Sequence, residues 1–168
     1  MKSLDCTFPT ALGRFNFRVG VIIANGRKVL MARNPKEKRV YFYSVGGRVK
    51  FGETMADAVA REMREETGIA CEVDRLAAVH ENFFMDDAGT PFHELSMYFT
   101  LKPNDALYSI ENGHRTDHGP DGEYLEWIDL DRCEGITFYP PFFQTMDFTD
   151  AAHVPHFVTS EWPEGICP

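Results

Sequence analysis

The sequence predicts an α+β sandwich rather than a doubly wound parallel sheet. One observation behind this prediction is the order of the elements, because strands come first, then a helix, then more strands and a short helix. The other is size: 168 residues are enough for one domain with a buried core and too few for two. We therefore expect a single domain over residues 1–168, with residues 1–13 as a loosely attached lead-in and residues 147–168 as a tail that ends in a strand.

The first half of the chain is predicted to form three strands followed by a helix. Runs of β-branched and aromatic residues predict the strands, over residues 17–24, 28–33 and 39–44. The helix is predicted over residues 54–67. Thr54 resembles a helix N-cap, and Gly68 follows the end of the helix in the position typical of a C-cap.

The second half is predicted to form strands, a long loop and a short helix. Strands are expected over residues 69–84 (one long or two short), 92–101, 124–128 and 153–160. Residues 103–121 are rich in Gly, Asp, Asn and Pro, which predicts a long loop, and loops of that length are usually functional or disordered. A short helix is expected over residues 139–147.

The charge of the chain is unevenly distributed. The formal net charge is −9 at pH 7, yet residues 1–102 hold 15 Lys and Arg against 13 Asp and Glu, whereas residues 103–168 hold 2 against 13. An acidic chain repels polyanions, so we expect no binding of long nucleic acids. The same charge is compatible with a small phosphorylated ligand held through metal ions.

Two further features bear on location. No apolar run approaches the ~20 residues of a membrane helix, and the N-terminus lacks the pattern of a secretory signal, so we expect no membrane partner. The four cysteines lie far apart and form no C-x-x-C pair. A reduced, cytoplasmic setting is therefore expected.

Three carboxylates converge on one turn of the predicted helix. Glu62, Glu65 and Glu66 stand at positions i, i+3 and i+4, where like charges repel unless a cation compensates them. A solvent-exposed acidic face is the simpler interpretation. On a helical wheel, however, Glu62 and Glu66 lie at the edge of the apolar stripe formed by residues such as Met63, while Arg61 lies opposite it. Carboxylates directed toward the packed side need a partner, which favours a site.

The stretch around these glutamates resembles the signature of the Nudix hydrolases. That signature is G, five residues, E, seven residues, R-E, an apolar residue, any residue, E-E, any residue, G and an apolar residue. The sequence fills every specified position of this box, namely Gly47, Glu53, Arg61, Glu62, Met63, Glu65, Glu66, Gly68 and Ile69. Nine specified positions at fixed spacing make the resemblance a strong signal.

The resemblance implies a fold and a reaction. The fold is an α/β/α sandwich with a mixed sheet between helices. The reaction is hydrolysis of the diphosphate linkage in a nucleoside diphosphate attached to a group X, which gives a nucleoside monophosphate and phosphorylated X. Mg²⁺ or Mn²⁺ is the implied cofactor, and a small nucleotide is the implied partner. A homodimer is compatible with the resemblance, because dimers are common in the family.

The resemblance also implies roles for single residues. Glu65 and Glu66 correspond to direct metal ligands, and Glu62 corresponds to a further ligand or to the base that activates water. Gly46, just ahead of the box, offers its backbone carbonyl to the metal. Arg61 and Glu53 correspond to an internal pair that fixes the loop against the helix.

The sequence departs from the usual family pattern at two positions outside the specified set. Val45 stands where a proline commonly precedes the two glycines, and Lys50 stands where a glutamate often follows the valine. The first change affects the rigidity of the loop, and the second affects contacts with the substrate. Catalysis is still expected, but the specificity stays open.

Further site residues are expected outside the box, and several candidates compete. Family members often take another carboxylate from a later segment, and Glu123 is our first choice among the acidic residues before Trp127, which are Asp117, Asp121, Glu123 and Glu126. Glu94 is the rival, with a strand residue paired to a base as the alternative. The cations ahead of the box could bind phosphate or be ordinary surface charge; they are Arg33, Lys38 and Arg39.

The sequence leaves the substrate open among nucleoside triphosphates, nucleotide sugars and similar diphosphates. Neither the ADP-ribose nor the dinucleoside polyphosphate marker is present beyond the box. The competing function is a non-catalytic domain that binds or senses a nucleotide. Such domains tend to lose carboxylates of the box, and this chain retains them, which favours the hydrolase.

Overall fold

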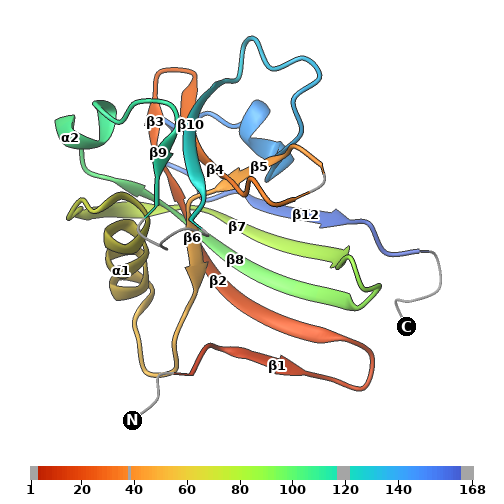
Figure 1. Ribbon diagram of the computed structural model, residues 1–168. Helices are drawn as coiled ribbons and strands as arrows, with labels where there is room; N and C mark the ends of the chain where they lie inside the picture. Colours follow the sequence, from red (N-terminus) through yellow and green to blue (C-terminus); the bar gives the residue numbers. More distant parts are fainter. Residues whose placement is uncertain (1–3, 38, 117–121, 164–168) are drawn as a thin grey trace.

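The computed structural model describes residues 4–37, 39–116 and 122–163. Within them, two mixed sheets form the body of the protein (Figure 1). One sheet has the longer strands, and we call it the larger sheet. Its strand order is β1-β2-β8-β7-β12, and β6 also pairs with β2. Its strands are β1 (Thr7–Pro9), β2 (Arg14–Ile22), β6 (Gly46–Arg48), β7 (Val73–Met85), β8 (Pro91–Leu101) and β12 (His156–Ser160). Because β2 runs parallel to β8 while β7 and β8 are antiparallel, the expected mixed sheet is confirmed.

The second sheet has the order β11-β5-β4-β10-β9, and the short strand β3 pairs with β4. Its strands are β3 (Ala24–Asn25), β4 (Lys28–Arg33), β5 (Phe42–Ser44), β9 (His114–Arg115), β10 (Tyr124–Asp129) and β11 (Phe138–Tyr139). The turn between β3 and β4 contains the Asn25-Gly26 pair, and all of β4 is paired with β10. This sheet brings the segment just before β10 toward the carboxylate-bearing helix.

That helix is α1 (Met55–Thr67), which agrees with the predicted residues 54–67. The Thr54 side chain accepts a hydrogen bond from the Asp57 N–H, and the Gly68 N–H caps the last turn through the Arg64 carbonyl. Figure 1 shows α1 beside β6, next to the larger sheet. The apolar stripe of the helix is fully buried at Val59 and Met63, where it joins a core formed with both sheets.

The chain departs from the expected elements in several places. The described part of the lead-in is not loose, because β1 pairs with β2 and Asp5 forms a bridge with Lys50. The expected loop over residues 103–121 contains a helical turn, α2 (Asp105–Tyr108), and strand β9. These pieces were missed because their partners are distant in sequence or their runs are too short to show a period.

Several boundaries also differ; β2, for example, begins at Arg14 rather than at residue 17, and β12 begins at His156 rather than at residue 153. The strand predicted over residues 39–44 begins only at Phe42, and the helix predicted over residues 139–147 is a short 3-10 helix, η2 (Pro141–Gln144). Among the described residues, no helix has the length and apolar character needed to cross a membrane.

A buried histidine ties β12 to the larger sheet. His80 is 3% exposed, and its Nε2 lies 2.8 Å from the Thr159 hydroxyl. Because that hydroxyl donates to the Asn82 side-chain oxygen, it accepts from the Nε2–H of a neutral imidazole. Burial lowers the pKa of His80 to about 4, against an opposing effect of Glu94 and a reinforcing effect of His156.

Lowering the pH should therefore destabilise the fold through His80. An unfolded histidine takes up a proton near pH 6.5 and the folded one near pH 4, so this contribution is complete above pH 6.5 and is lost as the pH falls between these values. At pH 5 the loss amounts to about 2 kcal/mol. Denaturant unfolding at pH 7 and pH 5 should show a smaller loss for His80→Gln than for wild type. The exposed His114→Gln is the control, and an unchanged pH dependence in His80→Gln would contradict the assignment.

Candidate active site

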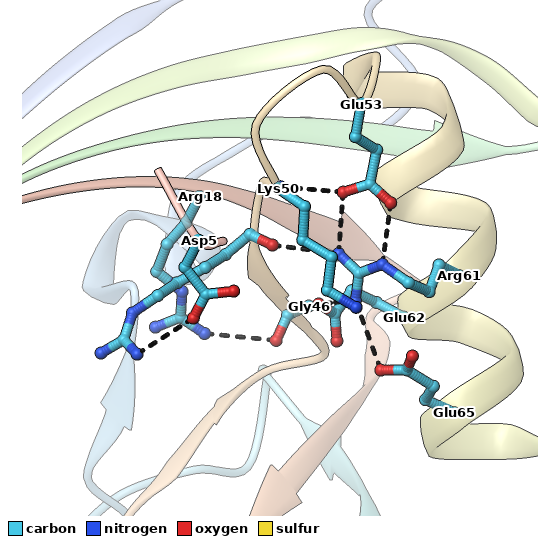
Figure 2. A network of polar contacts seen from close by, with 9 residues as sticks. Asp5, Arg18, Gly46, Lys50, Glu53, Arg61, Glu62 and Glu65 are labelled. Atoms are coloured by element: carbon cyan, nitrogen blue, oxygen red, sulfur yellow. Dashed lines mark hydrogen bonds and ion pairs between the residues drawn. The ribbon is translucent and has the colours of Figure 1, made fainter. Parts of the chain in front are cut away.

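Arg61 is the centre of a polar network that joins α1 to the preceding loop. Its Nε and Nη2 donate to the two oxygens of Glu53, at 2.8 and 3.0 Å, and Nη2 also donates to the Arg48 carbonyl at 3.0 Å. Its Nη1 contacts Glu62 at 2.5 Å and Glu65 at 3.3 Å. Figure 2 shows Glu53 and Glu65 on opposite sides of the guanidinium. The network therefore connects three carboxylates through one cation.

The position of Arg61 differs from the expectation of the helical wheel. The wheel places this residue opposite the apolar stripe, where solvent is expected, but its side chain is only 19% exposed. The wheel treats the helix alone, whereas here the chain after β6 folds back against the helix. The Arg61 side-chain hydrogen bond is the leading cause that lowers the pKa of Glu53, which keeps that carboxylate ionised.

Glu62 is buried against the glycine loop, as the wheel predicts. It is 7% exposed and Glu66 is 6% exposed. A Cβ placed on Gly47 would lie 2.2 Å from Glu62 Oε1, so only glycine lets the carboxylate approach the backbone here. The two predicted features, the glycine loop and the carboxylate, are thus in direct contact.

Glu66 is a buried carboxylate with an unsatisfied oxygen. Its Oε2 has no hydrogen-bond partner among the described residues. Burial, reinforced by the negative charges of Glu123 and Glu62, raises the pKa of the Glu66 carboxyl well above its usual range. A cation beside it would reverse this cost, because the ionised form would then be compensated.

Gly46 adds a backbone carbonyl beside this cluster. Its φ of 139° is one that side chains rarely allow, and a Cβ there would lie 2.3 Å from the Val19 carbonyl oxygen. The Gly46 carbonyl accepts a hydrogen bond from Arg18 Nη2 at 3.2 Å. Arg18 itself extends from β2, so β2 positions the backbone of β6 from the opposite side to α1 (Figure 2).

Glu123, the first choice among the later carboxylates, lies near the cluster. It accepts a hydrogen bond from the Tyr43 hydroxyl at 2.6 Å, and its main-chain N–H donates to Thr116. It comes immediately before β10, and its negative charge contributes to raising the pKa of Glu66. The second sheet thus brings a carboxylate from the later segment to the helix.

The carboxylates are not arranged as a ready metal-binding group. In the described part of the chain, no three His, Cys, Asp or Glu side chains are placed to hold an ion together. Glu62 and Glu65 instead each direct an oxygen at Arg61. The residues still fit a hard cation, because Glu66 offers a buried, unpartnered oxygen, and a hydrogen bond from the Gly46 main-chain N–H holds its carboxylate. Side-chain rotation of Glu62 or Glu65 would be needed to complete such a site.

An open cavity of about 400 Å³ lies beside the network. Its lining comes from the N-terminal segment, β2, β6, the following loop and α1, namely Asp5, Asn16, Arg18, Gly47, Arg48, Lys50, Arg61, Glu62 and Glu65. Four of these residues stand at specified positions of the predicted box. The residues at specified positions of the box therefore form only part of the cavity lining, and other residues form the rest.

The predicted residues outside the box are divided between the site and other places. Glu94 is buried on β8, where it accepts from Asn16 and Ser96, and lies 3.7 Å from Arg18. The contacts of Glu94 therefore fit the alternative expectation, which was a strand glutamate paired with a basic residue. That basic residue, Arg18, nevertheless lines the cavity.

Two of the cations predicted to bind phosphate, Arg33 and Arg39, do not line the cavity. Arg33 pairs with Glu126 at 3.2 Å and lies over the Tyr124 ring, both on β10. Arg39 is exposed, ahead of β5. The candidates Lys38, Asp117 and Asp121 lie outside the described residues.

Sequence reasoning missed four residues that line the cavity, which are Asp5, Asn16, Arg18 and Arg48. Asn16 and Arg18 alternate with apolar residues in the first long strand, so their shared face was readable from the period of two. Asp5 gave no signal, because its position depends on pairing with the distant Lys50.

Comparison with known proteins decides the family. The family model described as NUDIX domain matches residues 14–145, most of the chain. The chain belongs to the Nudix family. Its predicted family and its α/β fold are therefore confirmed, and the loop–helix unit around Arg61 is the Nudix box of this protein.

Sequence relatives within the Nudix family carry different names. The chain is 30% identical over 119 residues to an ADP-ribose pyrophosphatase from Methanocaldococcus jannaschii, which covers 71% of this chain and 64% of that protein. It is 27% identical over 127 residues to a Nudix hydrolase named YvcI, described as uncharacterized, from Bacillus subtilis, covering 76% and 74% of the two chains. The chain thus spans just under two thirds of the length of the archaeal relative.

A solved structure supports the fold. The MutT protein from Bacillus halodurans superposes with a TM-score of 0.57 at 18% sequence identity, covering 87% of this chain and 91% of that chain. At that identity the likeness concerns the arrangement of the backbone.

The role of Arg61 as the link between loop and helix is testable. Arg61→Lys removes the fork that binds both oxygens of Glu53 and the Arg48 carbonyl. We expect the free energy of unfolding to fall by about 1–3 kcal/mol. The Lys50 amide, which donates to Glu53, should exchange its hydrogen faster.

Arg64→Lys is the matched control, because Arg64 is an exposed arginine on the same helix. Native-state hydrogen exchange and denaturant unfolding give the two readouts. Equal protection of the Lys50 amide in Arg61→Lys and in the control would show that Arg61 does not hold the loop.

Proposed function

We propose that the chain is a metal-dependent hydrolase that cleaves the diphosphate linkage of a nucleoside diphosphate attached to a group X. The products are a nucleoside monophosphate and phosphorylated X. The observation that carries this proposal is the carboxylate cluster of α1 beside an open cavity, with Glu66 buried and one of its oxygens unpartnered. A structural domain without a ligand would gain nothing from keeping such a group.

We assign the metal-binding role to Glu65 and Glu66, with Glu62, Glu123 and the Gly46 carbonyl as further ligands. The chemistry that Mg²⁺ or Mn²⁺ supplies when bound is neutralisation of phosphate charge and acidification of water. Oxygen donors suit both ions. The buried carboxylates and the backbone carbonyl are the donors that this assignment requires.

The side chains of the site have separate tasks in the proposed reaction. A water oxygen attacks one phosphorus, the bond from that phosphorus to the bridging oxygen breaks, and the bridging oxygen leaves with the other phosphate. Glu62 accepts the proton of the attacking water in this assignment. We assign Arg61 and Glu53 as positioning residues, because Arg61 joins Glu53 in the loop to Glu62 on the helix.

The setting of the proposed enzyme follows from charge and cysteine chemistry. A small nucleotide is the proposed partner, and the acidic chain disfavours long nucleic acids. Cys6, Cys71 and Cys133 are free thiols in the described part of the chain, which supports a reduced, cytoplasmic location. A homodimer stays a prediction that size-exclusion chromatography with light scattering can test.

Hydrolysis should depend on the divalent ion and on Glu65. With Mg²⁺ and a panel of nucleoside triphosphates and nucleotide sugars, we expect turnover of at least one substrate, measured by the phosphorylated products. Glu65→Gln keeps the shape of the side chain but removes its charge. It should lower kcat by at least about 100-fold, because metal-assisted charge stabilisation is worth several kcal/mol.

Glu72→Gln is the control, because Glu72 is an exposed carboxylate that pairs with Lys102 away from the cavity. Wild-type rates in Glu65→Gln would contradict the assignment of Glu65. Tight nucleotide binding with no turnover under any metal would replace the hydrolase with the non-catalytic, nucleotide-binding function.

A further inference from the structure

One side of the cavity takes no part in the chemistry proposed above. Arg18, Arg48 and Lys50 lie along it, and we call these three residues the basic wall. The remaining lining residues are Asp5, Asn16, Gly47, Arg61, Glu62 and Glu65, so none of the described residues that line this cavity is aromatic or aliphatic. A nucleobase binds best on a flat apolar surface. The cavity therefore suits the charged part of a substrate.

The register of the sheet forces two of these cations together. Arg18 and Arg48 are direct partners in the antiparallel pairing of β2 with β6, so their side chains leave the sheet on the same face. Like charges in such a pair destabilise the sheet. Arg18 donates to the Gly46 carbonyl at 3.2 Å, but its nearest carboxylate among the described residues is Glu94 at 3.7 Å, and that of Arg48 is Asp5 at 3.5 Å. An anion that contacts both guanidinium groups would relieve this repulsion.

Lys50 adds a third positive charge to the same wall. Its main-chain N–H donates to Glu53 at 2.9 Å, which fixes the backbone at this point. Its ammonium forms no ion pair within the described residues, although its charge helps to lower the pKa of Glu53. The position is one where Nudix sequences often carry a glutamate, so this chain has the opposite charge there.

We propose that the basic wall binds a phosphate of the substrate that lies beyond the cleaved linkage. The site then prefers substrates that end in a phosphate, such as nucleoside triphosphates, over nucleotide sugars, whose terminal group is neutral. Guanidinium groups match phosphate oxygens through paired N–H donors, and an ammonium adds a point charge. A neutral sugar in the same place would bring no negative charge to offset the repulsion between the three cations. This preference rests on the proposed hydrolase function, but anion binding by the wall does not.

Anion binding can be measured without catalysis. The probe is inorganic tripolyphosphate, titrated into the full chain by isothermal calorimetry in EDTA, so that no divalent ion takes part. Lys50→Glu should weaken binding by about tenfold, and Lys50→Arg should stay within about threefold of wild type. Lys28→Glu is the matched control, because Lys28 is an exposed lysine on β4 away from the cavity.

A second variant predicts a change in the opposite direction. Asp5→Asn removes the carboxylate beside Arg48, so the wall becomes more positive, and tripolyphosphate should bind about two- to fivefold more tightly. Denaturant unfolding of each variant shows that it is folded. The expected pair of opposite shifts could not come from a misfolded protein or from a site elsewhere. Unchanged binding in both Lys50→Glu and Asp5→Asn would overturn the proposal.

Kinetics connect the basic wall to the substrate. Lys50→Glu should lower kcat/KM for a nucleoside triphosphate about tenfold and leave kcat/KM for a nucleotide sugar with the same base within about threefold. If wild type hydrolyses the panel but both substrates respond equally to Lys50→Glu, the preference is wrong and the hydrolase function stands. If wild type hydrolyses nothing but Lys50→Glu weakens tripolyphosphate binding, the anion site stands and the hydrolase function fails.

Discussion

Compensation of concentrated negative charge is the constraint on which this structure depends. One turn of α1 carries three glutamates, two of them buried, and such a turn is unfavourable without a cation nearby. Arg61 provides the positive charge and at the same time binds the loop that follows β6. The same guanidinium thus offsets the repulsion among the glutamates of α1 and fixes the glycine loop against the helix. Fold and candidate site share this one group.

The box could be predicted from the sequence because it is local. Its helix, its caps and the burial of Glu62 follow from spacing within a few turns, and the structure agrees with each of them. The Nudix resemblance added the pairing of Arg61 with Glu53, which the helical wheel alone would have contradicted. A wheel describes an isolated helix, and the loop that covers Arg61 lies outside its scope.

The other side of the cavity could not be predicted in the same way. Arg18 and Arg48 lie side by side because of the register between β2 and β6. Three strands of the second sheet, β3, β4 and β5, separate these two strands along the chain. The period of two shows which face of a strand a residue occupies, but it does not show which residue of a distant strand lies opposite. Glu123 was chosen from four acidic residues because family members often use a carboxylate from a later segment. Its distance from the helix is set by the pairing of β10 with β4.

The pairing of residues 4–9 with the core has a consequence for how this domain is delimited. Similarity to the family begins at residue 14, yet Asp5 lines the cavity and β1 extends the larger sheet ahead of that point. A fragment cut at the boundary of similarity would expose the edge of β2 and remove one acid from the cavity. The part of the chain that resembles the family and the part that is built into the larger sheet therefore have different N-terminal borders.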